Sequence, residues 1–160
     1  LTYSRAGRID VETDQVDLNV LVKEVIEIAA FPVNVHIQIN GSLPTIQIIK
    51  YAIMQVFANL IGNAVKHNDK EKIEIAIGCT EQTDSWLFYV KDNGPGIEKE
   101  FHEKVFQIFQ TLKTKDEVDS TGIGLSVVKK IIDNVGGKIW IESVADEGCT
   151  FYFTIKKHIK

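Results

Sequence analysis

The chain has 160 residues, 44% of them hydrophobic and 25% charged, and its formal net charge at pH 7 is −4. This composition is typical of one globular domain that buries its own core, and the mild acidity gives no reason to expect a nucleic-acid partner. No apolar run reaches membrane-spanning length and no signal-peptide pattern follows Leu1, so we expect a cytoplasmic fragment. Because it begins without a Met, we expect it to be cut from a longer protein, either membrane-attached or soluble.

The first 16 residues are expected to lie outside the main fold. Residues 1–8 have the pattern of the tail of a helix that ends near Gly7, and the polar stretch through Gln15 is typical of a linker. Asp17 can then cap a helix that ends before Pro32, with apolar residues at helical spacing: Leu18, Leu21, Val22, Val25 and Ile28. The alternation over residues 35–39 predicts a strand.

A helix over residues 50–67 carries an unusual polar stripe beside its apolar face. Gln55, Asn59, Asn63 and Lys66 recur at helical spacing, and asparagine lowers helix propensity. A solvated face more typically carries Glu and Lys, so stacked amides favour a functional explanation. The Asn63 side-chain oxygen suits Mg²⁺, and the Lys66 ammonium suits a phosphate.

Two strands, residues 72–78 and 86–91, are expected to pair and to lead into a sharp corner at Asp92. A carboxylate at a strand end is held rigidly, and Gly94 and Gly96, on either side of Pro95, let the backbone approach a flat ligand. The alternative is a simple tight turn, because Asp, Asn, Gly and Pro are the usual turn residues.

The last third of the chain predicts a short helix, a polar loop, a helix and a hairpin. Residues 98–109 are expected to form a helix that turns Phe101, Val105, Phe106 and Phe109 toward the core. Residues 110–120 form a loop long enough to close over a ligand. The Gly122–Leu125 run is expected to open a helix that ends at Gly136, with its free N–H groups available to phosphates. Residues 139–141 and 149–155 are expected to form the hairpin.

Cys79 and Cys149 are too few and too distant for a zinc site or disulfide framework.

Taken together, three of these motifs resemble a known family. Asn63 with Lys66, the corner from Asp92 to Gly96, and the loop from Thr121 to Leu125 resemble the N, G1 and G2 boxes of sensor histidine kinases, in the family's order. These kinases belong to the GHKL ATP-binding superfamily. The resemblance implies an α/β (α+β) two-layer sandwich, with a mixed, mostly antiparallel sheet and helices on one face.

The resemblance also implies a role for each matching residue. Asp92 would accept a hydrogen bond from the adenine amino group, shared with Thr150, and Asn63 would bind Mg²⁺. Lys66 would contact ribose or phosphate, and His67 stands where the family usually stacks an aromatic residue near adenine. Lys113, with Lys115 as a rival, matches a lid residue that reaches the γ-phosphate. The remaining nucleotide contacts would be Gly94, Gly96, Ile97, Ser120, Thr121, Gly122, Ile123, Gly124 and Leu125.

The residue at position 59 bears on whether the domain transfers a phosphoryl group or hydrolyses ATP. The superfamily's hydrolases carry at this position a glutamate that activates water, whereas an amide cannot take a proton. Transfer to a neutral imidazole needs mainly positioning and charge neutralisation. We therefore expect Asn59 to favour transfer.

The sequence therefore predicts the ATP-binding catalytic domain of a two-component kinase over residues 17–160, preceded over residues 1–16 by a remnant of the dimerisation helix. It would bind ATP with Mg²⁺ and phosphorylate a histidine on a dimerisation domain missing here, upstream of a response regulator. The fragment is expected to be monomeric and the full-length protein a homodimer. Ser120 stands where the G2 box has its first glycine. With His67, that departure leaves open a nucleotide-binding or interaction module with little catalysis, whereas a GHKL hydrolase is disfavoured by Asn59.

Overall fold

The computed structural model describes residues 13–106, 118–144 and 146–157, and over residues 118–123 it describes the backbone alone. One mixed sheet forms the base of the fold, with strand order β2-β4-β5-β7-β6. Its strands are β2 (Val35–Ile39), β4 (Ile73–Glu81), β5 (Ser85–Asp92), β6 (Ile139–Val144) and β7 (Gly148–Lys156). Only β2 and β4 pair in parallel among these described strands.

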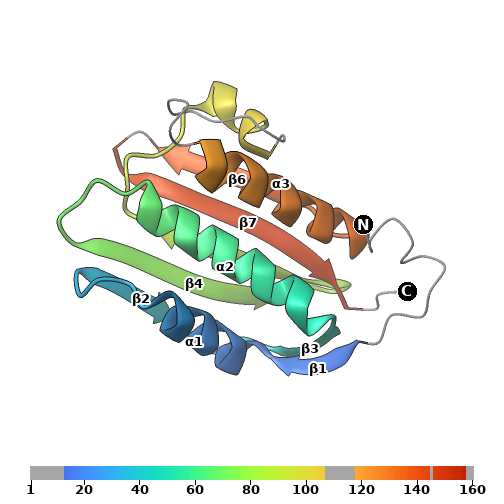
Figure 1. The fold of residues 1–160 in the computed structure, drawn as a ribbon. Helices are drawn as coiled ribbons and strands as arrows, with labels where there is room; N and C mark the ends of the chain where they lie inside the picture. Colours follow the sequence, from blue (N-terminus) through green and yellow to red (C-terminus); the bar gives the residue numbers. More distant parts are fainter. Residues whose placement is uncertain (1–12, 107–117, 145, 158–160) are drawn as a thin grey trace.

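Three helices cover one face of this sheet: α1 (Leu18–Ala29), α2 (Lys50–Lys66) and α3 (Val118–Asn134) (Figure 1). The core lies between the two layers because strand side chains alternate in direction. Phe88 in β5 and Phe153 in β7 are fully buried and stack at 5.0 Å between ring centroids, and Phe57 of α2 meets both edge-on. The expected two-layer sandwich is confirmed.

A second, two-stranded sheet was not expected from the sequence. β1 (Asp14–Asp17) pairs antiparallel with β3 (Thr45–Ile48), with Val16 buried opposite Ile46. The expected linker through Gln15 is therefore wrong for Asp14 and Gln15, because this pairing holds them against the domain. Asp17 does cap α1, since its Oδ1 accepts the backbone N–H of Asn19 at 2.9 Å.

Over its described residues, 98–106, the segment after the Asp92 corner is not the continuous helix expected over residues 98–109. It forms two short 3₁₀ turns, η2 (Lys99–Phe101) and η3 (Lys104–Phe106). Val105 is buried and Phe106 packs edge-on against Phe151 at 6.0 Å, whereas Phe101 is only half-buried. So few buried side chains cannot hold a longer helix, because helices in proteins depend on tertiary packing. Phe109 lies outside the described residues.

Helix α3 begins at Val118, so the expected opening at Gly122 is wrong. Asp119, Ser120 and Thr121 do not oppose helix formation in a first turn, where acidic and hydroxyl residues are favoured. The Gly122–Leu125 run therefore lies inside the helix, and its N–H groups are not at the helix start. Within the described ranges, no helix is long and apolar enough to span a membrane.

Candidate functional site

The Asp92 carboxylate ends β5 in a fixed position. Its Oδ1 accepts the backbone N–H of Gly94 at 2.8 Å and that of Cys149 at 3.3 Å. No other described residue donates to this carboxylate, so Oδ2 keeps its acceptor capacity. Asp92 continues the alternation of Phe88 and Val90, so it lies on the helix-covered side of the sheet.

Burial and hydrogen bonding have opposite effects on the pKa of Asp92. Desolvation, the largest effect, raises its pKa above the ordinary 3.8, and the N–H groups of Gly94 and Cys149 partly offset that rise. Burial also raises the pKa of the Cys149 thiol, with a further contribution from Asp92. Burial and Glu81 raise the pKa of Cys79 to about 11. Both thiols are therefore poor nucleophiles at neutral pH.

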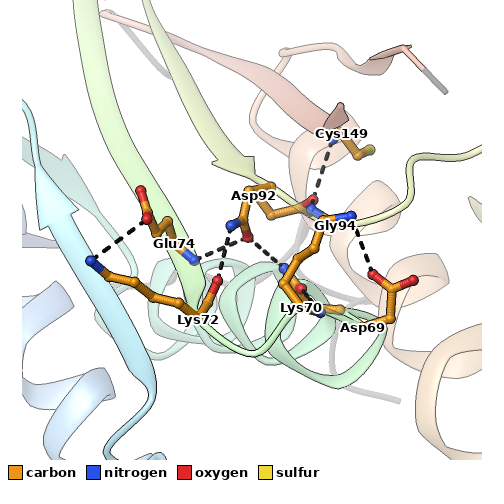
Figure 2. Close-up of polar contacts among 9 residues, drawn as sticks. Asp69, Lys70, Lys72, Glu74, Asp92, Gly94 and Cys149 are labelled. Carbon is orange, nitrogen blue, oxygen red and sulfur yellow. Dashed lines mark hydrogen bonds and ion pairs between the residues drawn. The ribbon is translucent and has the colours of Figure 1, made fainter. Parts of the chain in front are cut away.

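The Asn93 side chain ties this corner to the connection between α2 and β4. Figure 2 shows Lys72 and Glu74, at the end of that connection, beside Asp92 and Gly94. The Asn93 Oδ1 accepts from the Asn68 Nδ2 at 2.9 Å and from the backbone N–H of Glu74 at 3.0 Å. Its Nδ2 donates to the carbonyl of Lys72 at 3.0 Å. All three hydrogen bonds therefore hold the corner against one segment that follows α2.

The hairpin between β6 and β7 holds the other side of the corner. The Ser143 hydroxyl accepts the Ile97 N–H at 2.8 Å and donates to the Gly148 carbonyl at 3.1 Å, and the Asp146 N–H donates to the Pro95 carbonyl at 3.0 Å. The fit is close, because a Cβ on Gly148 would lie 2.0 Å from the Asp92 carbonyl oxygen. Gly96 has φ +85° and its Cβ would lie 2.7 Å from the Ser143 hydroxyl, so both positions require glycine.

The polar column on α2 consists of Asn59, Asn63 and Lys66. The Asn63 Oδ1 is buried and has no hydrogen-bond partner among the described residues. An orphaned buried acceptor is costly, so its presence calls for an explanation. A carbonyl-type oxygen in this state fits a hard cation such as Mg²⁺. Asn59 faces α3 closely, since a Cβ on Gly124 would lie 3.0 Å from its Oδ1.

His67 and Lys66 end the same helix. The His67 N–H caps α2 by donating to the carbonyls of Asn63 and Val65. Its ring is half-buried, whereas the Lys66 side chain is exposed. The structure thus brings Asn59, Asn63, Lys66 and His67 onto the last two turns of one helix.

Thr150 is not placed as expected. The register pairs Asp92 with Cys149 and Lys91 with Thr150, and the buried residues of β7 are Cys149, Phe151 and its alternating neighbours. The Thr150 side chain therefore points to the helix-free face and does not reach the Asp92 carboxylate. A shift of one residue along a strand reverses the face, so the residue of β7 whose backbone N–H meets the Asp92 carboxylate is Cys149.

The expected lid residues are only partly described. Lys113 lies outside the described residues, as does its rival Lys115. Ser120, Thr121, Gly122 and Ile123 are described only as backbone of α3. Of the remaining glycine-loop residues, Leu125 is buried in the core and Gly124 lies against Asn59.

A groove of about 730 Å³ lies on the helix-free face of the sheet, where Tyr89, Lys91, Thr150 and Tyr152 line it. Asp92 and Asn93 reach its edge, but no candidate on α2 is among the described residues that line it. We therefore place the candidate site on the helical side, where the orphaned Asn63 oxygen is found.

Sequence reasoning did not single out Asn68, Asn93 or Ser143. Asn93 was grouped with turn residues, and its side-chain partners lie in segments far away along the chain. No local pattern marks Ser143, whose hydroxyl meets the Ile97 N–H only because the hairpin folds against the corner.

Comparison with known proteins identifies the family. The model of the histidine kinase-, DNA gyrase B- and HSP90-like ATPase family matches residues 49–159. Cyanobacterial phytochrome A of Nostoc sp. is 50% identical over 116 residues, which cover 72% of this chain and 15% of the phytochrome. Cyanobacterial phytochrome B of the same organism is 39% identical over 161 residues, which cover 98% of this chain and 21% of the relative. The chain thus spans about a fifth or less of these relatives.

Solved structures agree with this result. The catalytic domain of histidine kinase ThkA superposes with a TM-score of 0.76 at 33% identity, covering 92% of this chain and 97% of that domain. ThkA in complex with the response regulator protein TrrA has a TM-score of 0.73 at 29% identity, covering 91% of this chain and 42% of that one. The chain belongs to the histidine kinase-, DNA gyrase B- and HSP90-like ATPase family, and within it to the ATP-binding catalytic domains of sensor histidine kinases.

Proposed function

We propose that this domain binds ATP with Mg²⁺ on the helical side of the sheet and transfers the γ-phosphoryl group to a histidine of a separate dimerisation domain. The observation that carries the proposal is the buried Oδ1 of Asn63, which has no hydrogen-bond partner in the described part of the chain and lies on the same helix as Asn59 and Lys66. When bound, Mg²⁺ supplies positive charge that offsets the charge of the phosphate oxygens.

The corner at Asp92 would bind and orient the adenine. Its Oδ1 is occupied by the N–H groups of Gly94 and Cys149, which leaves Oδ2 to accept from the exocyclic amino group. Guanine presents a carbonyl oxygen at that position, so a fixed carboxylate disfavours it. Gly94, Gly96 and Ile97 belong to the same turn, and His67, the C-cap of α2, would stack near the adenine.

The column on α2 would hold the phosphate end of the nucleotide. Asn63 is the proposed metal ligand, and the exposed Lys66 would contact ribose or phosphate. Lys113, together with Ser120 and Thr121 in the first turn of α3 and Gly122, Ile123 and Gly124 in the turn that follows, are the proposed further phosphate contacts. Asn59 has no basic atom, so it cannot activate water, and this supports transfer to an imidazole over hydrolysis.

The proposed partners follow from this chemistry. An acceptor histidine would lie on a dimerisation domain of the same kinase, of which residues 1–13 are the proposed remnant, and residues 14–160, which include β1, would form the catalytic unit. A response regulator would take the phosphoryl group onward, as supported by the ThkA complex with TrrA. We place these steps in the cytoplasm, where ATP is available, with a monomeric domain in a homodimeric full-length protein.

Transfer can be tested by supplying a histidine-bearing dimerisation domain of a sensor histidine kinase together with labelled ATP. We expect the wild-type domain to label that histidine and Asn63→Asp to lose the labelling, because a carboxylate changes both the charge and the donor geometry at the proposed metal. Wild-type labelling by Asn63→Asp would remove Asn63 from the site. Nucleotide binding with no labelling of any acceptor would favour a binding module without catalysis.

A further inference from the structure

We propose that Asn93 is a positioning residue that couples the two halves of the nucleotide site, the adenine corner and the phosphate-binding end of α2. This inference rests on the proposed function above. It goes beyond that proposal because the Asn93 side chain bonds other parts of the protein and is not one of the proposed ligand contacts.

The hydrogen bonds of Asn93 show how the coupling is built. Asp92 pairs with Ile75 at the end of the ladder between β4 and β5. One residue further, the Asn93 side chain continues this connection by accepting the Glu74 N–H at 3.0 Å and donating to the Lys72 carbonyl at 3.0 Å. These bonds fix the start of β4 against the corner.

The third hydrogen bond reaches the end of α2. The Asn68 Nδ2 donates to the Asn93 Oδ1 at 2.9 Å, and the Asn68 N–H donates to the Val65 carbonyl in the last turn of the helix. The His67 N–H donates to this same Val65 carbonyl and to the backbone carbonyl of Asn63. A continuous path of hydrogen bonds therefore links Asn93 to the turn of α2 that carries the unpaired Asn63 oxygen.

The amide is suited to this role because it offers an acceptor and a donor at one point. The Asn93 Oδ1 takes two N–H donors and the Nδ2 serves one carbonyl, so replacement by alanine removes three hydrogen bonds at once. The bonds of Asp92 to Gly94 and Cys149 do not involve this side chain and would persist. Loss of Asn93 should therefore leave the adenine corner formed and displace it relative to α2.

The test compares calorimetric binding of adenosine with that of a non-hydrolysable ATP analogue, with and without Mg²⁺. For Asn93→Ala we expect about tenfold weaker binding of the Mg²⁺-loaded analogue, loss of most of the enhancement by Mg²⁺, and a change in adenosine affinity of less than about threefold. A role in folding alone would lower the number of binding sites per chain without changing the Mg²⁺ enhancement.

Two further variants keep the result interpretable. Asn34→Ala is the matched control, because the Asn34 Nδ2 bonds the Glu71 carbonyl of the same connection at 2.9 Å without touching the corner, and we expect wild-type binding. If Asn93→Ala does not fold, Asn68→Ala removes one of the three bonds and should give the same pattern at about threefold.

An Asn93→Ala domain with the wild-type Mg²⁺ enhancement would overturn the coupling and leave the proposed function standing. Equal losses for adenosine and analogue would also overturn it, because Asn93 would then support the adenine corner alone. A wild-type domain that binds no analogue would instead overturn the proposed function, and the inference with it.

Discussion

The Asp92 corner and the polar column of α2 face the same proposed ligand but are built in opposite ways. Around the corner, the Asp92 Oδ1, the Asn93 amide and the Ser143 hydroxyl all have hydrogen-bond partners within the described residues. In the column, the Asn63 oxygen is buried without one, and Lys66 extends into solvent. The folded chain thus satisfies the polar groups of the corner, whereas the Asn63 oxygen in the column has no hydrogen-bond partner among the described residues.

This difference indicates where the domain is preorganised and where the ligand contributes. A satisfied polar network is rigid and specifies one geometry, which suits recognition of a flat base. An unpaired buried acceptor costs stability and is retained where a ligand or ion satisfies it. Substitutions of Gly148 and Ser143, which hold the corner in place, should therefore harm the fold, whereas substitution of Asn63 in the column should harm binding and spare the fold.

The largest effect on folding is expected from Gly148→Ala. The new Cβ would lie 2.0 Å from the Asp92 carbonyl, and φ at this residue is +116°. We expect a loss of more than about 3 kcal/mol in unfolding free energy, measured by denaturant titration. Gly62→Ala is the control, because a Cβ there meets no described atom within 4 Å, and it should stabilise α2 by about 0.5–1 kcal/mol. Equal stability of both variants would contradict a tightly held corner.

Ser143→Ala should have an intermediate effect. It removes one hydrogen bond to the Ile97 N–H and one to the Gly148 carbonyl, both partly buried. We expect about 1–2 kcal/mol of destabilisation in the same denaturant titration. A change below about 0.5 kcal/mol, the usual range for surface substitutions, would show that the hairpin does not hold the corner.

Asn63→Ala should raise stability slightly while abolishing the enhancement of nucleotide binding by Mg²⁺. The substitution removes an orphaned acceptor and improves helix propensity. We therefore expect the free energy of unfolding, measured by thermal denaturation, to rise by about 0.5–1 kcal/mol. Gln55→Ala is the matched control on the same helix, because its amide has a partner in the Tyr51 hydroxyl at 2.7 Å. Destabilisation by Asn63→Ala beyond that of Gln55→Ala would show that Asn63 supports the fold.

The smallest effect on folding is expected from Asp92→Asn, and it depends on pH. Because burial raises the folded-state pKa of Asp92 above 3.8, ionisation costs more in the folded protein than in the unfolded chain. The wild type therefore loses stability as the pH rises from 3.8 through the raised pKa. The amide can still accept from Gly94 and Cys149, so Asp92→Asn should melt higher at pH 7, with the difference closing toward pH 3.8.

Melting curves of both proteins between pH 3.8 and 8 would measure this difference. A lower melting temperature for Asp92→Asn at pH 7 would mean that the charge stabilises the corner, contrary to its desolvation.

Much of the fold followed from local patterns in the sequence. Asp17 was recognisable as a cap, the β5 alternation placed Asp92 at a strand end, and apolar spacing placed Asn59, Asn63 and Lys66 on one helix. The short strands β1 and β3 were missed because their pairing joins distant segments and each has only four residues. The 3₁₀ turns after Glu98 were missed because helical spacing does not show how little surface is buried.

Candidate site residues could be predicted where a local motif marks them, but not where their role depends on contacts between segments that are distant in the sequence. The order and context of the three boxes singled out Asp92 and Asn63 as candidates. The contacts of Asn93 and Ser143 depend on tertiary structure that the sequence does not display. The error at Thr150 arose because sequence similarity does not fix strand register to one residue, although register decides which face a side chain occupies.

The most direct test of the central claim is a calorimetric titration with non-hydrolysable analogues of ATP and GTP, each with and without Mg²⁺. The wild-type domain should bind the ATP analogue in preference to the GTP analogue, and more tightly with Mg²⁺. Asp92→Asn should lose the preference for adenine while remaining folded, and Asn63→Ala should lose the dependence on Mg²⁺. Absence of analogue binding in the wild type, or wild-type selectivity in Asp92→Asn, would contradict a nucleotide site built from this corner and this helix.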